Sequence, residues 1–162
     1  MREELRRRCE LFVENRDIIK SAFGWESAYV YPMCSGILTA RGVHADAQRL
    51  LECRDILKAG TGIFSNFRGV YKLATIAMLS LRTDSEIMME QMLELYGKLK
   101  ECFWGSEYLT VAAATIAEMA EPSEYEEIID KTGRIYSRMK NAHPFLTSGE
   151  DSAFAALLAM SG

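Results

Sequence analysis

The sequence predicts an all-α protein of about eight helices, arranged as antiparallel helix pairs that stack into an α-solenoid-like array or an irregular helical bundle. Three observations support this prediction. Apolar residues recur at steps of three and four along most of the chain, which is the period of an α-helix. Segments that are apolar on every face alternate with amphipathic segments, so the first helix of each pair is expected to be the inner one. Capping residues recur at nearly equal spacing.

The N-terminal helix is expected over residues 1–23. Its apolar side chains recur at steps of three or four, or at a doubled step across Arg16: Leu5, Cys9, Phe12, Ile19 and Phe23. Gly24 then ends the helix. The run Arg6-Arg7-Arg8 is interpreted as a solvated face that pairs with nearby glutamates at helical spacing, and not as a site for an acidic partner.

Three helix pairs follow, over about residues 28–62, 67–104 and 107–145, and a final helix occupies residues 151–162. Asp46 and the capping boxes Thr83-x-x-Glu86 and Ser123-x-x-Glu126 are expected to begin the amphipathic member of each pair. The positions Asp46, Asp84 and Ser123 are 38 and 39 residues apart, which is typical of helical repeats. Residues 1–162 are therefore interpreted as a single all-helical domain.

The composition is that of an ordinary globular protein, with 49% hydrophobic and 26% charged residues. The net charge of −4 disfavours nucleic acid and an anionic membrane as partners. The four cysteines form no C-x-x-C pair and are interpreted as buried thiols in a reducing compartment. No signal peptide is visible and the longest apolar runs are too short to cross a bilayer, so a cytoplasmic protein is expected.

The candidate binding surface consists of the turns between the helix pairs, because the turns of stacked hairpins lie along one edge. Each turn combines an aromatic side chain with polar groups at a helix N-terminus, whose free N–H groups suit an anion or a carboxylate. The simpler interpretation makes the polar residues helix caps, with Phe64, Phe103 and Phe145 plugging the core between units. The candidate binding residues are Asn66, Arg68, Ser106, Glu107, Tyr108, His143, Thr147, Ser148, Glu150 and Asp151.

No complete catalytic set is recognisable, and no catalytic residue, metal ligand or cofactor is assigned. The alternative function is a small-molecule or metal-dependent enzyme centred on the turn at residues 143–151, where His143 lies near Glu150 and Asp151 in sequence. Neither carboxylate is at helical ligand spacing from His143, however. The sequence therefore favours a non-enzymatic role.

Four motifs as a set resemble the bacterial domain-of-unknown-function family numbered 4003, from about residue 12 onward. The motifs are Tyr31-Pro32 at a helix start, Phe64-Ser65-Asn66-Phe67-Arg68-Gly69, Ser106-x-Tyr108-Leu109-Thr110, and Ile135-Tyr136-x-x-Met139-Lys140-x-x-His143-Pro144-Phe145-Leu146-Thr147-Ser148-x-Glu150-Asp151. The resemblance implies an all-helical cytoplasmic protein, mostly from Gram-positive bacteria, with no established activity and no catalytic residues to carry over. Members of that family are longer, which implies that this chain is a fragment or a shortened member.

The expected function is that of a binding or interaction module that uses the turns between its helix pairs. The expected partner is an unidentified protein or a small anionic ligand, and neither nucleic acid nor a membrane. Apolar side chains cover several faces of the last helix, so a homodimer through residues 151–162 is expected. These side chains are Phe154, Leu157, Leu158 and Met160. The alternative is that this helix packs wholly inside its own domain, against residues 107–141.

Overall fold

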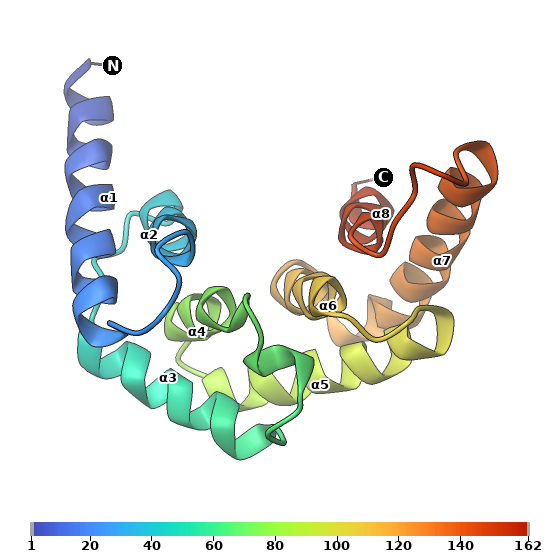
Figure 1. Cartoon of the computed structure of the whole chain (residues 1–162), viewed down its shortest axis with the longest axis horizontal. Coiled ribbons are helices and arrows are strands. Elements are labelled where there is room, and N and C mark those ends of the chain that lie inside the picture. The colour runs from blue at the N-terminus through green and yellow to red at the C-terminus, as the bar shows by residue number, and fades with distance from the viewer. Residues whose placement is uncertain (1, 162) are drawn as a thin grey trace. The chain divides into compact units, whose positions relative to one another are not determined.

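The computed structural model describes residues 2–161 of the chain. Over this range the chain forms eight α-helices and two short 3-10 helices and contains no β-strand, which confirms the predicted all-α class (Figure 1). The helices are α1 (Arg2–Ala22), α2 (Val30–Ala40), α3 (Ala47–Gly60), η1 (Asn66–Arg68), α4 (Lys72–Ser80), α5 (Ser85–Cys102), α6 (Glu107–Met119), η2 (Pro122–Glu124), α7 (Tyr125–Ala142) and α8 (Asp151–Met160). None of these helices is both long and apolar enough to span a membrane.

The chain divides into two compact units after Ser85. Unit 1 contains α1 to α4, and unit 2 begins at Glu86 and contains the rest of α5 together with α6, α7 and α8. Each unit is described below by itself. The single domain expected from the sequence stays a prediction.

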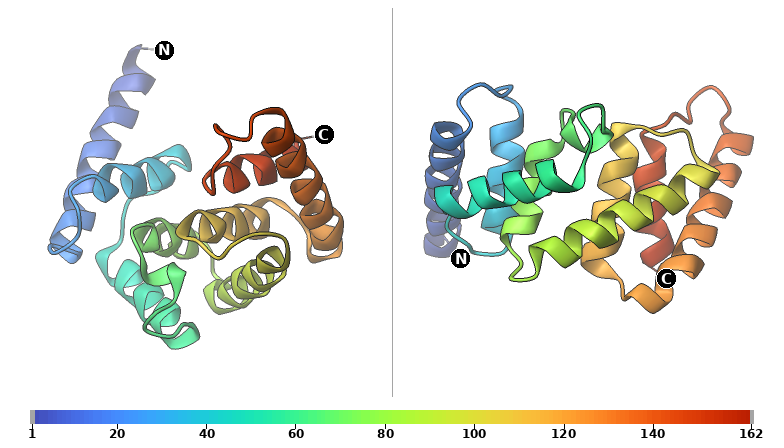
Figure 2. Two further views of the ribbon diagram at one scale, coloured as in Figure 1. Left: turned by 45° about the vertical axis from the view of Figure 1, so that its right-hand side comes forward. Right: turned by 90° about the horizontal axis from the view of Figure 1, so that it is seen from below.

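The apolar helices pack against one another in the interior of each unit. In unit 1, α2 contacts α4, and α1 and α3 contact this pair from outside. In unit 2, α8 lies against both α6 and α7 (Figure 2). The buried faces of α6 and α8 are rich in small residues, which lets the two helix backbones approach closely. These small residues are Ala112, Ala113, Ala117, Ala155, Ala156 and Ala159.

A buried asparagine joins α1 to the loop between α2 and α3. Asn15 is 0% exposed. Its amide donates to the carbonyl of Val43 at 2.9 Å and to the Thr39 hydroxyl at 3.3 Å, and its oxygen accepts from the Ala45 N–H at 2.6 Å. Three partners satisfy most of the polar capacity of this side chain, so the loop is held against α1 by hydrogen bonds as well as by packing.

The predicted helix caps are partly realised. Asp46 caps α3, because its carboxylate accepts from the N–H groups of Gln48 at 2.9 Å and Arg49 at 3.2 Å. The cap predicted at Ser123 is wrong. Helical structure already begins at Pro122, whose fixed φ suits the first turn, so Ser123 lies inside η2. Glu124 instead accepts from the N–H of Glu121 at 2.9 Å.

Two of the four cysteines are buried as predicted, and two are not. Cys34 and Cys53 are buried, and burial raises the pKa of the Cys34 thiol to about 12. Cys9 and Cys102 are exposed. Residues 2–10 of α1 are all exposed, so the apolar stripe of this helix is covered only from Leu11 onward. Cys9 precedes that point, and Cys102 is the last residue of α5.

Phe64 and Phe145 do not plug the core, since both side chains are fully exposed. Each lies in a tight turn that is closed by backbone hydrogen bonds, from Ser65 N to Gly62 O and from Leu146 N to His143 O. Because these main-chain bonds already stabilise the turns, their aromatic side chains are free to face solvent. Phe103 differs, because it is half-buried against Tyr136 in unit 2.

Candidate functional site

The candidate residues of unit 1, Asn66 and Arg68, belong to the short helix η1. The Arg68 guanidinium donates to the Thr61 hydroxyl at 3.0 Å and to the carbonyl oxygens of Lys58 and Thr61 at 2.6 Å each. Arg68 therefore closes the C-terminal end of α3, where helix carbonyls lack intrahelical partners. Its hydrogen bonds are structural, while its positive charge still contributes to the surface around it.

The turn at residues 143–151 of unit 2 is closed by its own hydrogen bonds. The carbonyl of His143 accepts from the N–H groups of Leu146 at 3.1 Å and Thr147 at 3.0 Å. The Asp151 carboxylate accepts from the N–H of Ser148 at 2.7 Å. The first turn of α8 thus carries a carboxylate whose hydrogen bond goes back to the preceding turn, and the binding role expected of this turn stays a prediction.

In unit 2, the turn after α5 and the turn at residues 143–151 line the same cavity. The segment that follows α5, the C-terminal half of α7 and the start of α8 enclose an open pocket of about 420 Å³, lined in part by Cys102 and Trp104. The ring of Tyr136 packs edge-on against Phe103, with centroids 5.0 Å apart. Its hydroxyl donates to the carbonyl of Ser148 at 3.3 Å. We call this cavity the unit 2 pocket.

Two of the ten candidate residues, Thr147 and Ser148, line the unit 2 pocket. The other candidates of unit 2 are not among the residues that line it. Ser106 caps α6 through the N–H of Leu109 at 3.3 Å, and Glu107 and Tyr108 belong to the first turn of that helix. His143, which ends α7, and Glu150 are exposed and do not line the pocket, and neither does Asp151.

Sequence reasoning missed seven residues of this pocket as site residues: Cys102, Phe103, Trp104, Tyr136, Lys140, Gly149 and Ser152. Tyr136 and Lys140 are four residues apart on α7 and therefore share one helix face, which was a recognisable signal. Trp104 is 96% exposed, which is unusual for so large an apolar ring. Lys140 is the one charged side chain among the lining residues, and it is exposed.

The unit 2 pocket can offer stacking surfaces, hydroxyl groups and one ammonium group to a ligand. The rings of Phe103, Trp104 and Tyr136 supply the apolar surface. Lys140 supplies the positive charge, and Thr147 and Ser148 supply hydroxyls. Among residues 2–161, no group of three or more His, Cys, Asp or Glu side chains is placed to hold a metal ion.

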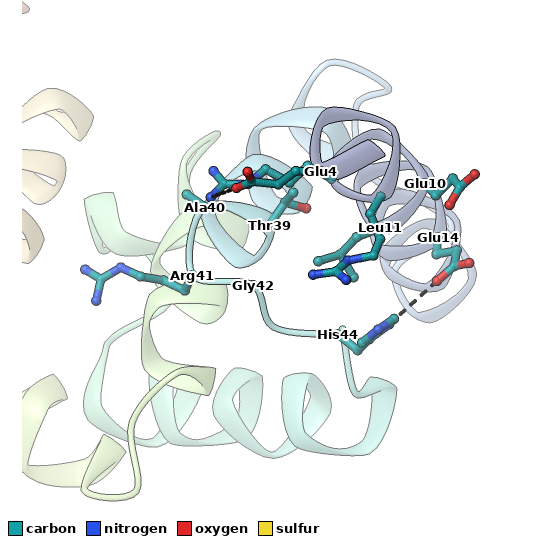
Figure 3. Close-up of a pocket in the computed structure, with 11 residues that line it drawn as sticks. Glu4, Glu10, Leu11, Glu14, Thr39, Ala40, Arg41, Gly42 and His44 are labelled. Atoms are coloured by element: carbon teal, nitrogen blue, oxygen red, sulfur yellow. Dashed lines mark hydrogen bonds and ion pairs between the residues drawn. The ribbon is translucent and has the colours of Figure 1, made fainter. Parts of the chain in front are cut away.

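A groove of about 510 Å³ in unit 1, between α1 and the loop after α2, has mostly charged walls (Figure 3). Glu4 pairs with Arg8 at 3.2 Å, and Figure 3 shows the Glu14 carboxylate facing His44, 3.6 Å from Nδ1. These side chains are well exposed, so solvent screens their interactions. The Arg8 pair confirms that the arginine run is a solvated face paired with glutamates, and we do not consider this groove the candidate site.

Comparison with known proteins places the sequence in a family. The sequence model of the family described as "Protein of unknown function (DUF4003)" matches residues 15–162. No curated protein and no solved structure gives a significant match to this chain.

Proposed function

This chain belongs to the DUF4003 family, and we propose that it is a binding module whose unit 2 pocket holds a small molecule with a flat apolar part and one anionic group. The observation that carries the proposal is the pairing of an almost fully exposed tryptophan with a single lysine at one cavity. An exposed tryptophan gains much apolar burial when a ligand stacks on it. Lys140 then selects for a negative charge near that ring.

The ligand chemistry follows from what the pocket lacks as well as from what it has. No carboxylate lines this cavity, so a cationic ligand would find no counter-ion among the lining residues. A purely inorganic anion would leave the rings of Phe103, Trp104 and Tyr136 uncovered. A ligand with both an apolar ring and a carboxylate or phosphate uses the two kinds of surface together.

Single-tryptophan fluorescence tests the proposal. The chain has two tryptophans, so Trp25→Phe leaves Trp104 as the sole reporter. We expect benzoate and phenyl phosphate to change the Trp104 emission in a saturable way, and benzamide and acetate to do so far more weakly. Amide NMR signals of residues 147–149 should shift in the same titration. Shifts confined to another surface, or no saturable change with either anion, would refute the proposal.

Two variants of α7 provide the matched comparison. Lys140→Met should abolish the preference for benzoate over benzamide while leaving weak ring binding in place. Arg138→Met removes the same charge two residues away, from a side chain that does not line the pocket. It should leave the preference unchanged. An equal effect of both variants would mean that only general surface charge matters, and would count against the site.

We also infer a bacterial, cytoplasmic protein built from helical repeats. The inferred compartment is supported by the free thiols of Cys9, Cys34, Cys53 and Cys102, which suit reducing surroundings. The repeat is supported by the regular alternation of apolar helices, α2, α4, α6 and α8, with the more polar helices between them.

A further inference from the structure

Unit 1 contains another cavity, which differs from the charged groove beside α1 and is independent of the unit 2 pocket. Its volume is about 460 Å³, and it lies between the turn after α1, α3, the loop before η1 and α4. We call it the unit 1 groove. Its floor is apolar and consists of side chains that belong to the core: Phe23, Leu57, Leu73 and Ile76.

Two large apolar side chains stand exposed at the rim of this groove. Trp25 is fully exposed, and Ile63 is 78% exposed. They come from turns that are far apart in sequence and line the same cavity. Phe64, which is also fully exposed, follows Ile63 directly. An exposed tryptophan next to an apolar concavity is the kind of surface at which protein interfaces have their strongest contacts.

The rim is positively charged, although the whole chain carries a net negative charge. Four cationic residues and one carboxylate line the groove. The carboxylate, Glu26, pairs with Lys72 at 2.7 Å, and Arg54 pairs with the adjacent Asp55 at 2.8 Å. The hydrogen bonds of Arg68 go to neutral oxygens, and Lys58 is exposed. The pairs formed by Glu26 and Asp55 therefore leave a net positive charge on this rim.

We propose that the unit 1 groove docks an acidic segment of another protein, with one bulky apolar side chain of that segment inserted against Trp25 and its acidic residues beside Lys58 and Arg68. Charge complementarity selects the acidic partner, because an interface favours potentials of opposite sign. The concave apolar floor favours a protruding side chain over a membrane surface. A bilayer would be met by a convex surface, and this feature is hollow.

Fluorescence anisotropy with the full chain tests this proposal. The probe is the fluorescein-labelled hexapeptide Asp-Glu-Phe-Leu-Glu-Asp, together with its permutations that move the Phe-Leu pair along the peptide. Saturable binding that weakens as salt is added is expected for at least one of these peptides. The same peptides with Lys in place of the acids, or with Ala-Ala in place of Phe-Leu, should bind at least tenfold more weakly.

Point variants locate the binding surface. Trp25→Ala should weaken binding about 30-fold, the effect expected of an interface hot spot. Lys58→Glu should weaken it about tenfold and reduce its salt dependence. Two exposed controls elsewhere in unit 1, Tyr29→Ala and Arg7→Glu, should leave affinity unchanged, with the helical circular dichroism of every variant matching that of the parent chain.

Three outcomes would overturn the proposal. The first is the absence of saturable binding by any acidic peptide. The second is equal binding of the acidic and lysine peptides. The third is sedimentation of the protein with vesicles of phosphatidylcholine and phosphatidylserine, lost in Trp25→Ala and Lys58→Glu, without peptide binding. That third result would assign this surface to a membrane. None of the three bears on the unit 2 pocket, so the two proposals fail separately.

Discussion

The substitution Asn15→Ala is expected to destabilise the protein by about 2–4 kcal/mol. It removes the acceptor of the half-buried Ala45 N–H, and leaving a donor unpaired beside the core costs about 1–3 kcal/mol. It also removes the two bonds that the Asn15 amide donates, to Val43 and Thr39. Because Val43 is exposed, water can replace one of these partners, and we assign the two bonds about 1 kcal/mol together.

Urea unfolding measures this loss. For a denaturant slope of about 2 kcal/mol/M, the transition midpoint should fall by roughly 1–2 M while the slope stays constant. The control Asn141→Ala makes the same change at an exposed site in the last turn of α7 and should alter stability by less than about 0.5 kcal/mol. If Asn15→Ala falls within that same limit, the polar contacts between α1 and the loop do not stabilise unit 1, and our reasoning fails.

Three further predictions concern other parts of the chain. A thiol reagent should label Cys9 and Cys102 rapidly and the two buried cysteines slowly, and rapid reaction of a third thiol would contradict the observed burial. In thermal unfolding, Glu124→Ala should lower stability by about 0.5–1 kcal/mol and Ser123→Ala should change it little. A larger loss from Ser123→Ala than from Glu124→Ala would mean that Ser123 is the cap after all. We propose that the protein is a homodimer through the exposed apolar side chains of α8. Light scattering should then give the mass of a dimer, and Leu158→Glu should convert it to a folded monomer. A monomeric parent protein would exclude the dimer.

The helical class was predictable because apolar spacing is a local property that survives in the fold. Polar core contacts were not. Periodicity assigns a polar residue such as Asn15 to the solvent face, and only the arrival of a loop 24 to 30 residues later provides its partners. The cap of α7 was misassigned for a related reason: Ser123 is a residue type that suits an N-cap, but helical structure already begins one residue earlier, at Pro122.

The site was only partly predictable. Turn composition drew attention to Thr147 and Ser148, which do line the unit 2 pocket. It could not show that Trp104 is exposed, because the sequence of a turn is the same whether its aromatic side chain packs into the core or faces solvent. It also could not show that the Arg68 guanidinium donates to backbone carbonyl oxygens, since every residue carries such an acceptor.

That choice of acceptors has an evolutionary consequence. Arg68 binds main-chain oxygens of Lys58 and Thr61, so the side chain of Lys58 can vary among related proteins without loosening the end of α3. Arg68 itself has no such freedom, because a lysine ammonium cannot reproduce a planar fork that reaches both carbonyls and a hydroxyl at once. Across the family, position 68 should therefore remain arginine, while the residue type at position 58 should vary. A lineage could then change the charge of the unit 1 groove by altering position 58 alone, without remodelling the loop that shapes it.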